Sequence, residues 1–331
     1  MQMSFQANWL RRSMNEGERP PTFLGLAESG READVVILQI PYELTSSYGQ
    51  GSEHGPAATV AASAQVELYD PLLPEDLPCG FTLKTSAPWD GKGDTLKQQL
   101  SGITEYVASN LDNGAFPLAL GGEHGMLPAL LTAVAQHPEL KGELSGLTLV
   151  QIDAHADLRN DLEGDEDSHA CAARRALDLG IGRLLQMGIR AISREEFEFI
   201  ESDARVTTWL AREVMSICDG EAAWNNWLDS LRQIEGPIWL TIDVDGLDPA
   251  YVPTTGTPVP GGLAYWQVVE TIETIGESSG ANWLGADINE IAPDENNHVS
   301  EFTAAMLATK VVATHLASKL DIERNKSKEV R

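Results

Sequence analysis

The sequence contains few cysteines and no long apolar segment. Its three cysteines, Cys79, Cys171 and Cys218, are odd in number and unpaired in spacing, which predicts reduced thiols and excludes a disulfide framework. No apolar run approaches the roughly 20 residues that a membrane span needs, and the first residues do not resemble a secretory signal. We therefore expect a cytoplasmic protein.

Basic residues are also scarce. The 331 residues include 23 Lys and Arg against 50 Asp and Glu, a net charge of −27. A surface this negative repels phosphate backbones and anionic lipids, so we expect neither a nucleic-acid nor a membrane partner. A small cationic ligand is favoured instead.

Short apolar runs alternate with helical segments along most of the chain. We expect strands over 35–40, 116–120, 147–152, 184–189, 238–242 and 283–288, and helices over 96–111, 127–136, 170–179, 221–234, 263–275 and 300–320. This alternation predicts an α/β fold, a single three-layer α/β/α domain with a mostly parallel sheet. We place the domain at 31–322, between a polar N-terminal extension (1–30) and a polar C-terminal tail (323–331).

Polar clusters follow four of the expected strands. They are Gly121-Gly122-Glu123-His124-Gly125, Asp153-Ala154-His155-Ala156-Asp157, Asp243-Val244-Asp245-Gly246-Leu247-Asp248-Pro249 and Asn289-Glu290. Parallel sheets bind ligands at the carboxyl ends of their strands. Alternate residues of an extended segment point the same way, so the acidic and histidine side chains within each cluster can converge.

Four aspartates and two histidines from these clusters suit two divalent metal ions. The six are His124, Asp153, His155, Asp157, Asp243 and Asp245. Unpaired buried carboxylates would cost several kcal/mol each, and mixed oxygen and imidazole ligands favour Mn, Fe, Co, Ni or Zn over Ca or Mg. Two ions about 3.5–4 Å apart lower the pKa of a shared water towards ~7, which predicts hydrolysis. One Asp-x-Asp motif alone at a strand end more often forms a loop or a helix cap, so the prediction depends on the clusters occurring together.

These motifs resemble those of the ureohydrolase family, which holds arginases, agmatinases and related guanidino- and formimino-hydrolases, over about residues 40–320. The resemblance implies an arginase-like fold, a manganese centre and a homo-oligomer, a trimer or hexamer. It also implies that one ion is bound by His124 and Asp157, the other by His155 and Asp245, and both by Asp153 and Asp243.

The chain departs from the usual family pattern at three positions near these motifs. Gly125 replaces a usual serine, Thr254 a usual glycine and Asn289 a commonly apolar residue. None of the changes removes a predicted ligand. Thr254 could reshape the loop at the edge of the site.

Two further residues match functional positions of the resembled family. His169 lies in the polar loop after the second motif, where a family histidine passes protons to the leaving amine. Glu290 matches a glutamate that binds the guanidinium through two parallel hydrogen bonds. The alternatives are a solvent-facing loop histidine for the first and a helix-capping carboxylate for the second.

The resemblance implies that a metal-bridging hydroxide attacks the guanidinium carbon, that Asp157 and the metals hold the tetrahedral intermediate, and that His169 assists proton transfer. The chain is most like agmatinases, which convert agmatine to putrescine and urea. Alternatives are another ureohydrolase substrate (guanidinobutyrate, arginine, guanidine or formiminoglutamate) or a catalytically silent regulatory or scaffold relative. Retention of all six ligands argues against the last.

Substrate choice rests on charge. The resembled arginases have an acid directly after Gly-Ile-Arg, whereas here Ala191-Ile192-Ser193 follow Gly188-Ile189-Arg190 and offer no acid to the α-ammonium of arginine. The loop after the second motif carries Glu163, Asp165, Glu166 and Asp167, which would attract the far ammonium of agmatine. Arg159 could instead bind a substrate carboxylate, but we expect it to pair with nearby acids.

Overall fold

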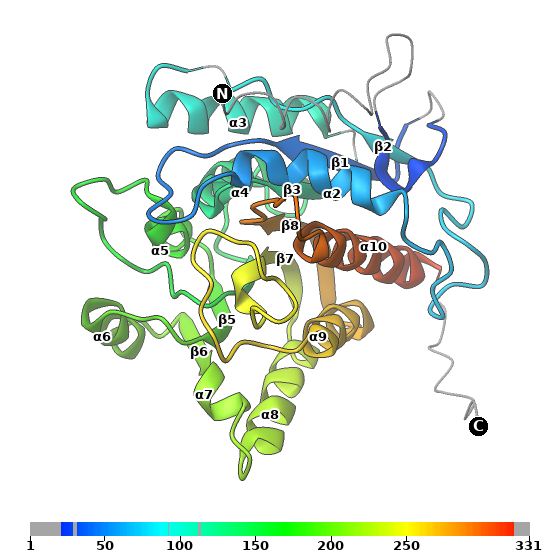
Figure 1. Ribbon diagram of the computed structural model, residues 1–331. Coiled ribbons are helices and arrows are strands. Elements are labelled where there is room, and N and C mark those ends of the chain that lie inside the picture. Colours follow the sequence, from blue (N-terminus) through cyan, green and yellow to red (C-terminus); the bar gives the residue numbers. More distant parts are fainter. Residues whose placement is uncertain (1–20, 29–31, 92, 112–113, 321–331) are drawn as a thin grey trace.

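An eight-stranded, all-parallel sheet runs through the centre of the protein (Figure 1). The structure is a computed structural model that describes residues 21–28, 32–91, 93–111 and 114–320. The strand order is β2-β1-β3-β8-β7-β4-β5-β6. The strands are β1 (Val35–Ile40), β2 (Leu83–Thr85), β3 (Phe116–Gly121), β4 (Thr148–Ile152), β5 (Arg183–Ile189), β6 (Val206–Leu210), β7 (Gly236–Asp243) and β8 (Ala281–Asn289).

Helices cover both faces of this sheet. They are α2 (Gly55–Ser63), α3 (Leu96–Asn110), α4 (Leu127–Val134), α5 (Ala172–Asp178), α6 (Arg194–Ser202), α7 (Ala211–Val214), α8 (Gly220–Arg232), α9 (Tyr265–Glu277) and α10 (Val299–Lys319). Side chains alternate between the faces, as along β1, where Val35 and Ile37 pack in the core beneath α2, α8, α9 and α10. Val36 and Leu38 pack in the second core, beneath α3, α4 and α5. The expected three-layer α/β/α fold is confirmed.

All six expected strands are present, and the sheet has two more at its edges. β2 has only three residues, and β6 contains the exposed Thr207 and the half-buried Thr208, so neither forms the fully apolar run of a central strand. The six expected helices are present with shifted ends. Helix α5 begins at Ala172 because His169–Cys171 form a separate 3₁₀ turn.

The expected terminal segments lie largely outside the described residues, which omit 1–20 and 321–331. Within residues 21–28, Phe23 and Leu24 are buried in the core. The backbone N–H of Leu24 donates to Ser63 Oγ at 2.8 Å, so this segment is attached to α2. No helix in the described part of the chain is long and apolar enough to cross a membrane.

The strand order brings the four polar clusters together. Strands β3, β8, β7 and β4 are consecutive neighbours at the centre of the sheet. Their last residues are in register, since Ile152 pairs with Ile242 and Asp243 pairs with Asn289. Because all four strands run the same way, their clusters emerge side by side at one edge.

Candidate metal centre

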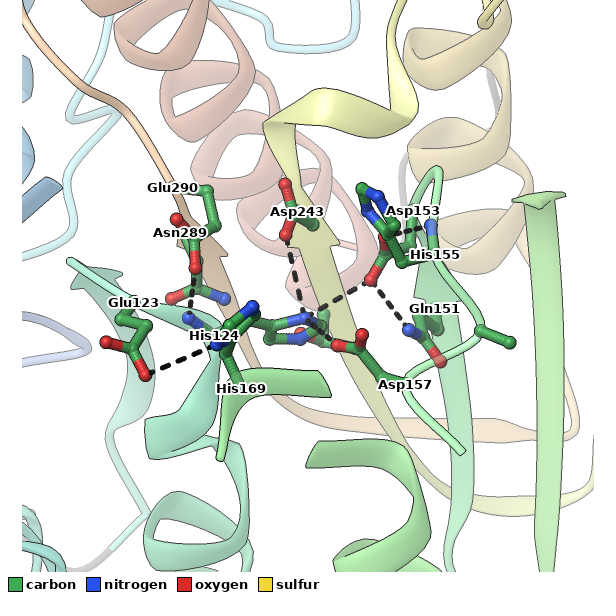
Figure 2. A network of polar contacts seen from close by, with 12 residues as sticks. Glu123, His124, Gln151, Asp153, His155, Asp157, His169, Asp243, Asn289 and Glu290 are labelled. Atoms are coloured by element: carbon green, nitrogen blue, oxygen red, sulfur yellow. Dashed lines mark hydrogen bonds and ion pairs between the residues drawn. The ribbon is translucent and has the colours of Figure 1, made fainter. Parts of the chain in front are cut away.

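The six predicted metal ligands lie together at this carboxyl edge of the sheet, and five of them are labelled in Figure 2. His124, Asp153 and Asp157 form one group whose ligand atoms lie within 4.8 Å of one another. Nδ1 of His124 is 3.0 Å from Asp157 Oδ2 and 3.2 Å from Asp153 Oδ2. All three side chains are buried.

A second group contains His155, Asp245 and again Asp153. Nδ1 of His155 lies 3.0 Å from Asp245 Oδ2 and 3.7 Å from Asp153 Oδ1. Asp153 thus faces both histidines. Asp243 lies on the neighbouring strand, with its Oδ2 3.8 Å from His124 Nδ1.

The pKa shifts within the cluster indicate a site for positive ions. Burial and the negative charge of Asp153 raise the pKa of Asp157 to about 7. Burial and the carboxylates of Asp245, Asp153 and Glu290 raise the pKa of Asp243 well above its usual range. Although burial opposes it, the neighbouring carboxylates raise the pKa of His155 to about 12. These shifts favour protonation of the buried groups. Divalent cations at the same place would balance the negative charge of the carboxylates instead.

The hydrogen bonds of His124 also suit a metal ligand. Thr241 Oγ1 donates its only proton to Asp287 Oδ2 at 2.6 Å, so the 2.8 Å contact between Thr241 Oγ1 and His124 Nε2 requires an Nε2–H donor. The other nitrogen, Nδ1, faces the carboxylates and makes no aligned hydrogen bond within the described residues. Metal-bound histidines are held in this way, through the nitrogen that does not bind the ion.

Sequence analysis missed the residues that support the ligands. Asp287 is fully buried and also accepts hydrogen bonds from Trp239 Nε1 and Asn289 Nδ2. Gln151 Nε2 donates to Asp153 Oδ2 at 2.8 Å. Gln151, Thr241 and Asp287 each lie two residues before a strand-end polar residue, inside an apolar run. A polar residue at that position, inside an otherwise apolar run, was the signal in the sequence that could have identified them.

His169 lies beside the cluster and lines the same pocket. Its side chain is 19% exposed, and Nδ1 is 3.1 Å from Thr45 Oγ1 and 3.9 Å from Glu123 Oε1. Burial lowers the pKa of His169, although the nearby carboxylate of Glu123 opposes this shift. The ring therefore favours the neutral form, which can accept a proton.

Glu290 lines the pocket on the side of β8. Its Oε1 accepts a hydrogen bond from the backbone N–H of His124 at 2.8 Å, which fixes the carboxylate against the first motif. Burial and the charge of Glu123 raise its pKa well above the usual range. A cation beside Glu290 would offset that cost.

Arg159 and Arg190 each have partners outside the pocket. Arg159 Nε lies 4.0 Å from Glu196 Oε2, the acid pairing expected from the sequence. Arg190 donates to the backbone carbonyls of Gly188, Asp245, Gly246, Leu247 and Val259 at 2.6 to 3.3 Å. No Lys or Arg is among the described residues that line the pocket, and neither are the acids of the loop at 163–167.

Two of the departures have structural partners. Thr254 donates through its hydroxyl and its backbone N–H to Ser300 Oγ, at 2.7 and 2.9 Å, which fastens its loop to α10. Asn289 donates to Asp287 at 2.5 Å and so joins the support of His124.

Comparison with known proteins identifies the family. The model of the arginase family matches residues 33–317. The chain belongs to the arginase family. A Synechocystis protein named N(1)-aminopropylagmatine ureohydrolase is 35% identical over 291 residues, covering 85% of this chain and 89% of that protein. A Bacillus anthracis agmatinase is 34% identical, covering 82% and 88%.

Solved structures agree. The agmatine ureohydrolase of Thermoplasma volcanium superposes with a TM-score of 0.76 at 27% identity, covering 96% of this chain and 100% of that one. This arginase-family protein is therefore an agmatinase-like ureohydrolase, as the motifs predicted.

Proposed function

We propose that the protein hydrolyses the guanidino C–N bond of agmatine, giving putrescine and urea, at a centre of two Mn²⁺ ions. The observation that carries the proposal is a single pocket lined by four residues of the six-residue cluster, together with His169 and Glu290. The arginase family membership supports the same reaction.

In this proposal His124 and Asp157 hold one ion, His155 and Asp245 the other, and Asp153 and Asp243 bridge them. The position of Asp153 between both histidines supports its bridging role. When bound, the two ions would supply a hydroxide nucleophile at neutral pH.

The other side chains bind the substrate and move protons. Glu290 would pair with the guanidinium, which satisfies a carboxylate that is costly to keep charged in isolation. His169, in its neutral form, would take a proton and deliver it to the departing amine. Asp157 would stabilise the tetrahedral intermediate that forms at the guanidinium carbon.

Charge favours agmatine over substrates that carry a carboxylate. Arginine and guanidinobutyrate would each bring a negative group to a pocket whose described lining contains no Lys or Arg. Arg190 is hydrogen-bonded to backbone carbonyls, and Arg159 lies 4.0 Å from Glu196. Agmatine carries an ammonium at that end instead, and the net charge of −27 attracts it.

A second candidate substrate is N(1)-aminopropylagmatine, because the Synechocystis relative at 35% identity bears that activity in its name. This molecule extends agmatine by an aminopropyl group and so adds one more cationic nitrogen. The same charge argument applies to it.

A substrate panel tests the proposal. Urea release by the Mn²⁺-loaded protein is measured with agmatine, N(1)-aminopropylagmatine, arginine, guanidinobutyrate and guanidine, and formamide release with formiminoglutamate. We expect kcat/KM for agmatine to exceed that for arginine at least ~10-fold, the ratio that 1.4 kcal/mol of discrimination gives. A higher value for aminopropylagmatine would select the second candidate. A better result with guanidinobutyrate or guanidine would overturn the agmatinase assignment but keep the two-metal hydrolase.

We also propose that the chain acts in the cytoplasm as a homo-oligomer, a trimer or hexamer. The low cysteine content supports the compartment. Light scattering of the purified protein tests the assembly.

A further inference from the structure

The loop that begins at Leu44 is attached to Glu123, the residue before His124. Glu123 is fully buried. Its Oε2 accepts the backbone N–H groups of Leu44 and Thr45 at 2.8 and 2.6 Å, and its Oε1 accepts the Thr45 hydroxyl. Figure 2 shows Glu123 on the far side of His169 from the metal-ligand carboxylates. Its carboxylate therefore supports the loop and not the ligand cluster.

Thr45 connects this carboxylate to His169. The backbone N–H of His169 donates to Thr45 Oγ1 at 3.0 Å, and His169 Nδ1 lies 3.1 Å from the same oxygen. A carboxylate only accepts hydrogen bonds, so the single hydroxyl proton of Thr45 points at Glu123. The contact with Nδ1 then needs Nδ1–H as the donor. The Ser168 hydroxyl is farther from Nδ1, at 3.4 Å.

Because Gly125 has no side chain, it leaves room for the contacts among Glu123, Thr45 and His169. A Cβ at Gly125 would lie 3.1 Å from Glu123 Oε1, 3.3 Å from His169 N and 3.4 Å from His169 Cα. Two of these distances are tighter than ordinary van der Waals contact. A Cβ at this position would require Glu123 or His169 to move by a few tenths of an ångström, so the glycine and the Thr45 hydroxyl favour the same arrangement.

We infer that Thr45, held by Glu123 and given room by Gly125, is a positioning residue for His169. It fixes the tautomer with the proton on Nδ1, which leaves the lone pair on Nε2, and it holds the ring at the pocket. The inference rests on the proposed function, in which His169 moves a proton during guanidine hydrolysis. Nothing in it requires Thr45 to touch the substrate.

The test removes the hydroxyl at constant shape. In Thr45→Val we expect kcat for agmatine to fall about 10-fold or more, part of the usual weight of general acid–base catalysis, while KM changes less than about twofold. Thr45→Ser should restore most of kcat, because it keeps the hydroxyl. Thr132→Val, a change of the same chemistry on the exposed side of α4, is the matched control.

Coupling to His169 separates positioning from a general structural effect. In a His169→Asn background, Thr45→Val should lower kcat by less than about twofold, because the residue it positions is gone. An equal loss in both backgrounds would overturn the inference, as would an unchanged kcat in Thr45→Val. Should Thr45→Val fail to fold, Gly125→Ala is measured instead, with metal content at the wild-type level. We expect a lower kcat at similar KM, and an unchanged kcat would overturn the inference.

A readout without catalysis distinguishes failure of the proposed function. Hydrogen exchange of the metal-loaded protein should show faster exchange of the His169 amide in Thr45→Val than in Thr45→Ser. If the wild type released urea from no guanidino compound, the proposed function would fail while this exchange result still decided the contact. Equal protection in the two variants would refute the positioning role.

Discussion

The two ends of strands β3 and β8 surround buried histidines with opposite environments. At the carboxyl ends, His124 is 1% exposed and faces the carboxylates of Asp153 and Asp157. At the amino ends, His315 of α10 is 5% exposed and stacks on Phe116, with ring centroids 3.8 Å apart. It also meets Trp283 edge to face.

The pKa shifts of these histidines differ in sign. Although burial opposes it, the neighbouring carboxylates of Asp153 and Asp157 raise the pKa of His124 well above its usual range. Burial among aromatic rings, with a contribution from Lys319, lowers the pKa of His315 to about 3. The carboxyl ends of the strands therefore favour a positive charge, and the amino ends disfavour one.

The largest expected effect comes from removing a carboxylate at the carboxyl end. Asp243→Ala should lower the content of bound Mn²⁺ and nearly abolish urea release, because two cations would lose a shared negative ligand. Metal analysis and turnover check this together. Asp229→Ala, at an exposed ion pair with Arg232, is the control and should leave both values unchanged. Normal metal content in Asp243→Ala would contradict its assignment as a ligand.

His169→Ala should keep the metal but lose turnover. We expect kcat to fall about 10²-fold or more, the usual contribution of a general acid–base group, because no other imidazole could replace it beside Thr45. Metal analysis and steady-state kinetics measure the two quantities. Unchanged turnover would leave His169 without a catalytic role.

Glu290→Gln tests the guanidinium partner. The amide keeps an oxygen that can accept the His124 backbone N–H but removes the charge, so metal content should stay and kcat/KM for agmatine should fall about 10-fold or more. The measurement compares kcat/KM at equal metal content. Wild-type kinetics in this variant would refute the assignment.

The smallest effect concerns the amino end. His315 has a folded-state pKa of about 3 against about 6.5 when unfolded, so the unfolded chain binds the proton first as pH falls. Its contribution to the free energy of unfolding is complete above pH ~6.5. As the pH drops from there towards the folded-state pKa, this contribution decreases by up to about 1.4 kcal/mol per pH unit.

His315→Leu should remove this part of the acid sensitivity. Urea unfolding of the metal-free wild type and variant at pH 7 and pH 5 gives the difference, expected to shift by about 2 kcal/mol in favour of the variant at the lower pH. An identical pH dependence would show that His315 titrates normally.

The sequence predicted the central strands because their apolar runs are continuous, and it predicted the candidate ligands because each cluster follows such a run. It did not predict the edge strands β2 and β6, which bury less and carry a weaker pattern. Nor could it predict the order of the strands, which sets β8 between β3 and β7.

The supporting contacts were hidden for a related reason. Thr45 lies 78 residues before Glu123, and Thr241 lies 117 residues after His124, so only the folded sheet brings each pair together. Gly125 was visible as a departure, but its meaning depends on the distance from His169. A motif shows which residues follow a strand, whereas the tertiary structure determines which distant residues contact and orient them.

We propose that the carboxyl ends of β3, β4 and β7 hold two divalent ions on which guanidine hydrolysis depends. The most direct measurement titrates metal-free protein with Mn²⁺ while recording both bound metal and urea release from agmatine. We expect no urea release without metal and a plateau of turnover at two ions per chain. Full turnover by protein that contains no transition metal would contradict it.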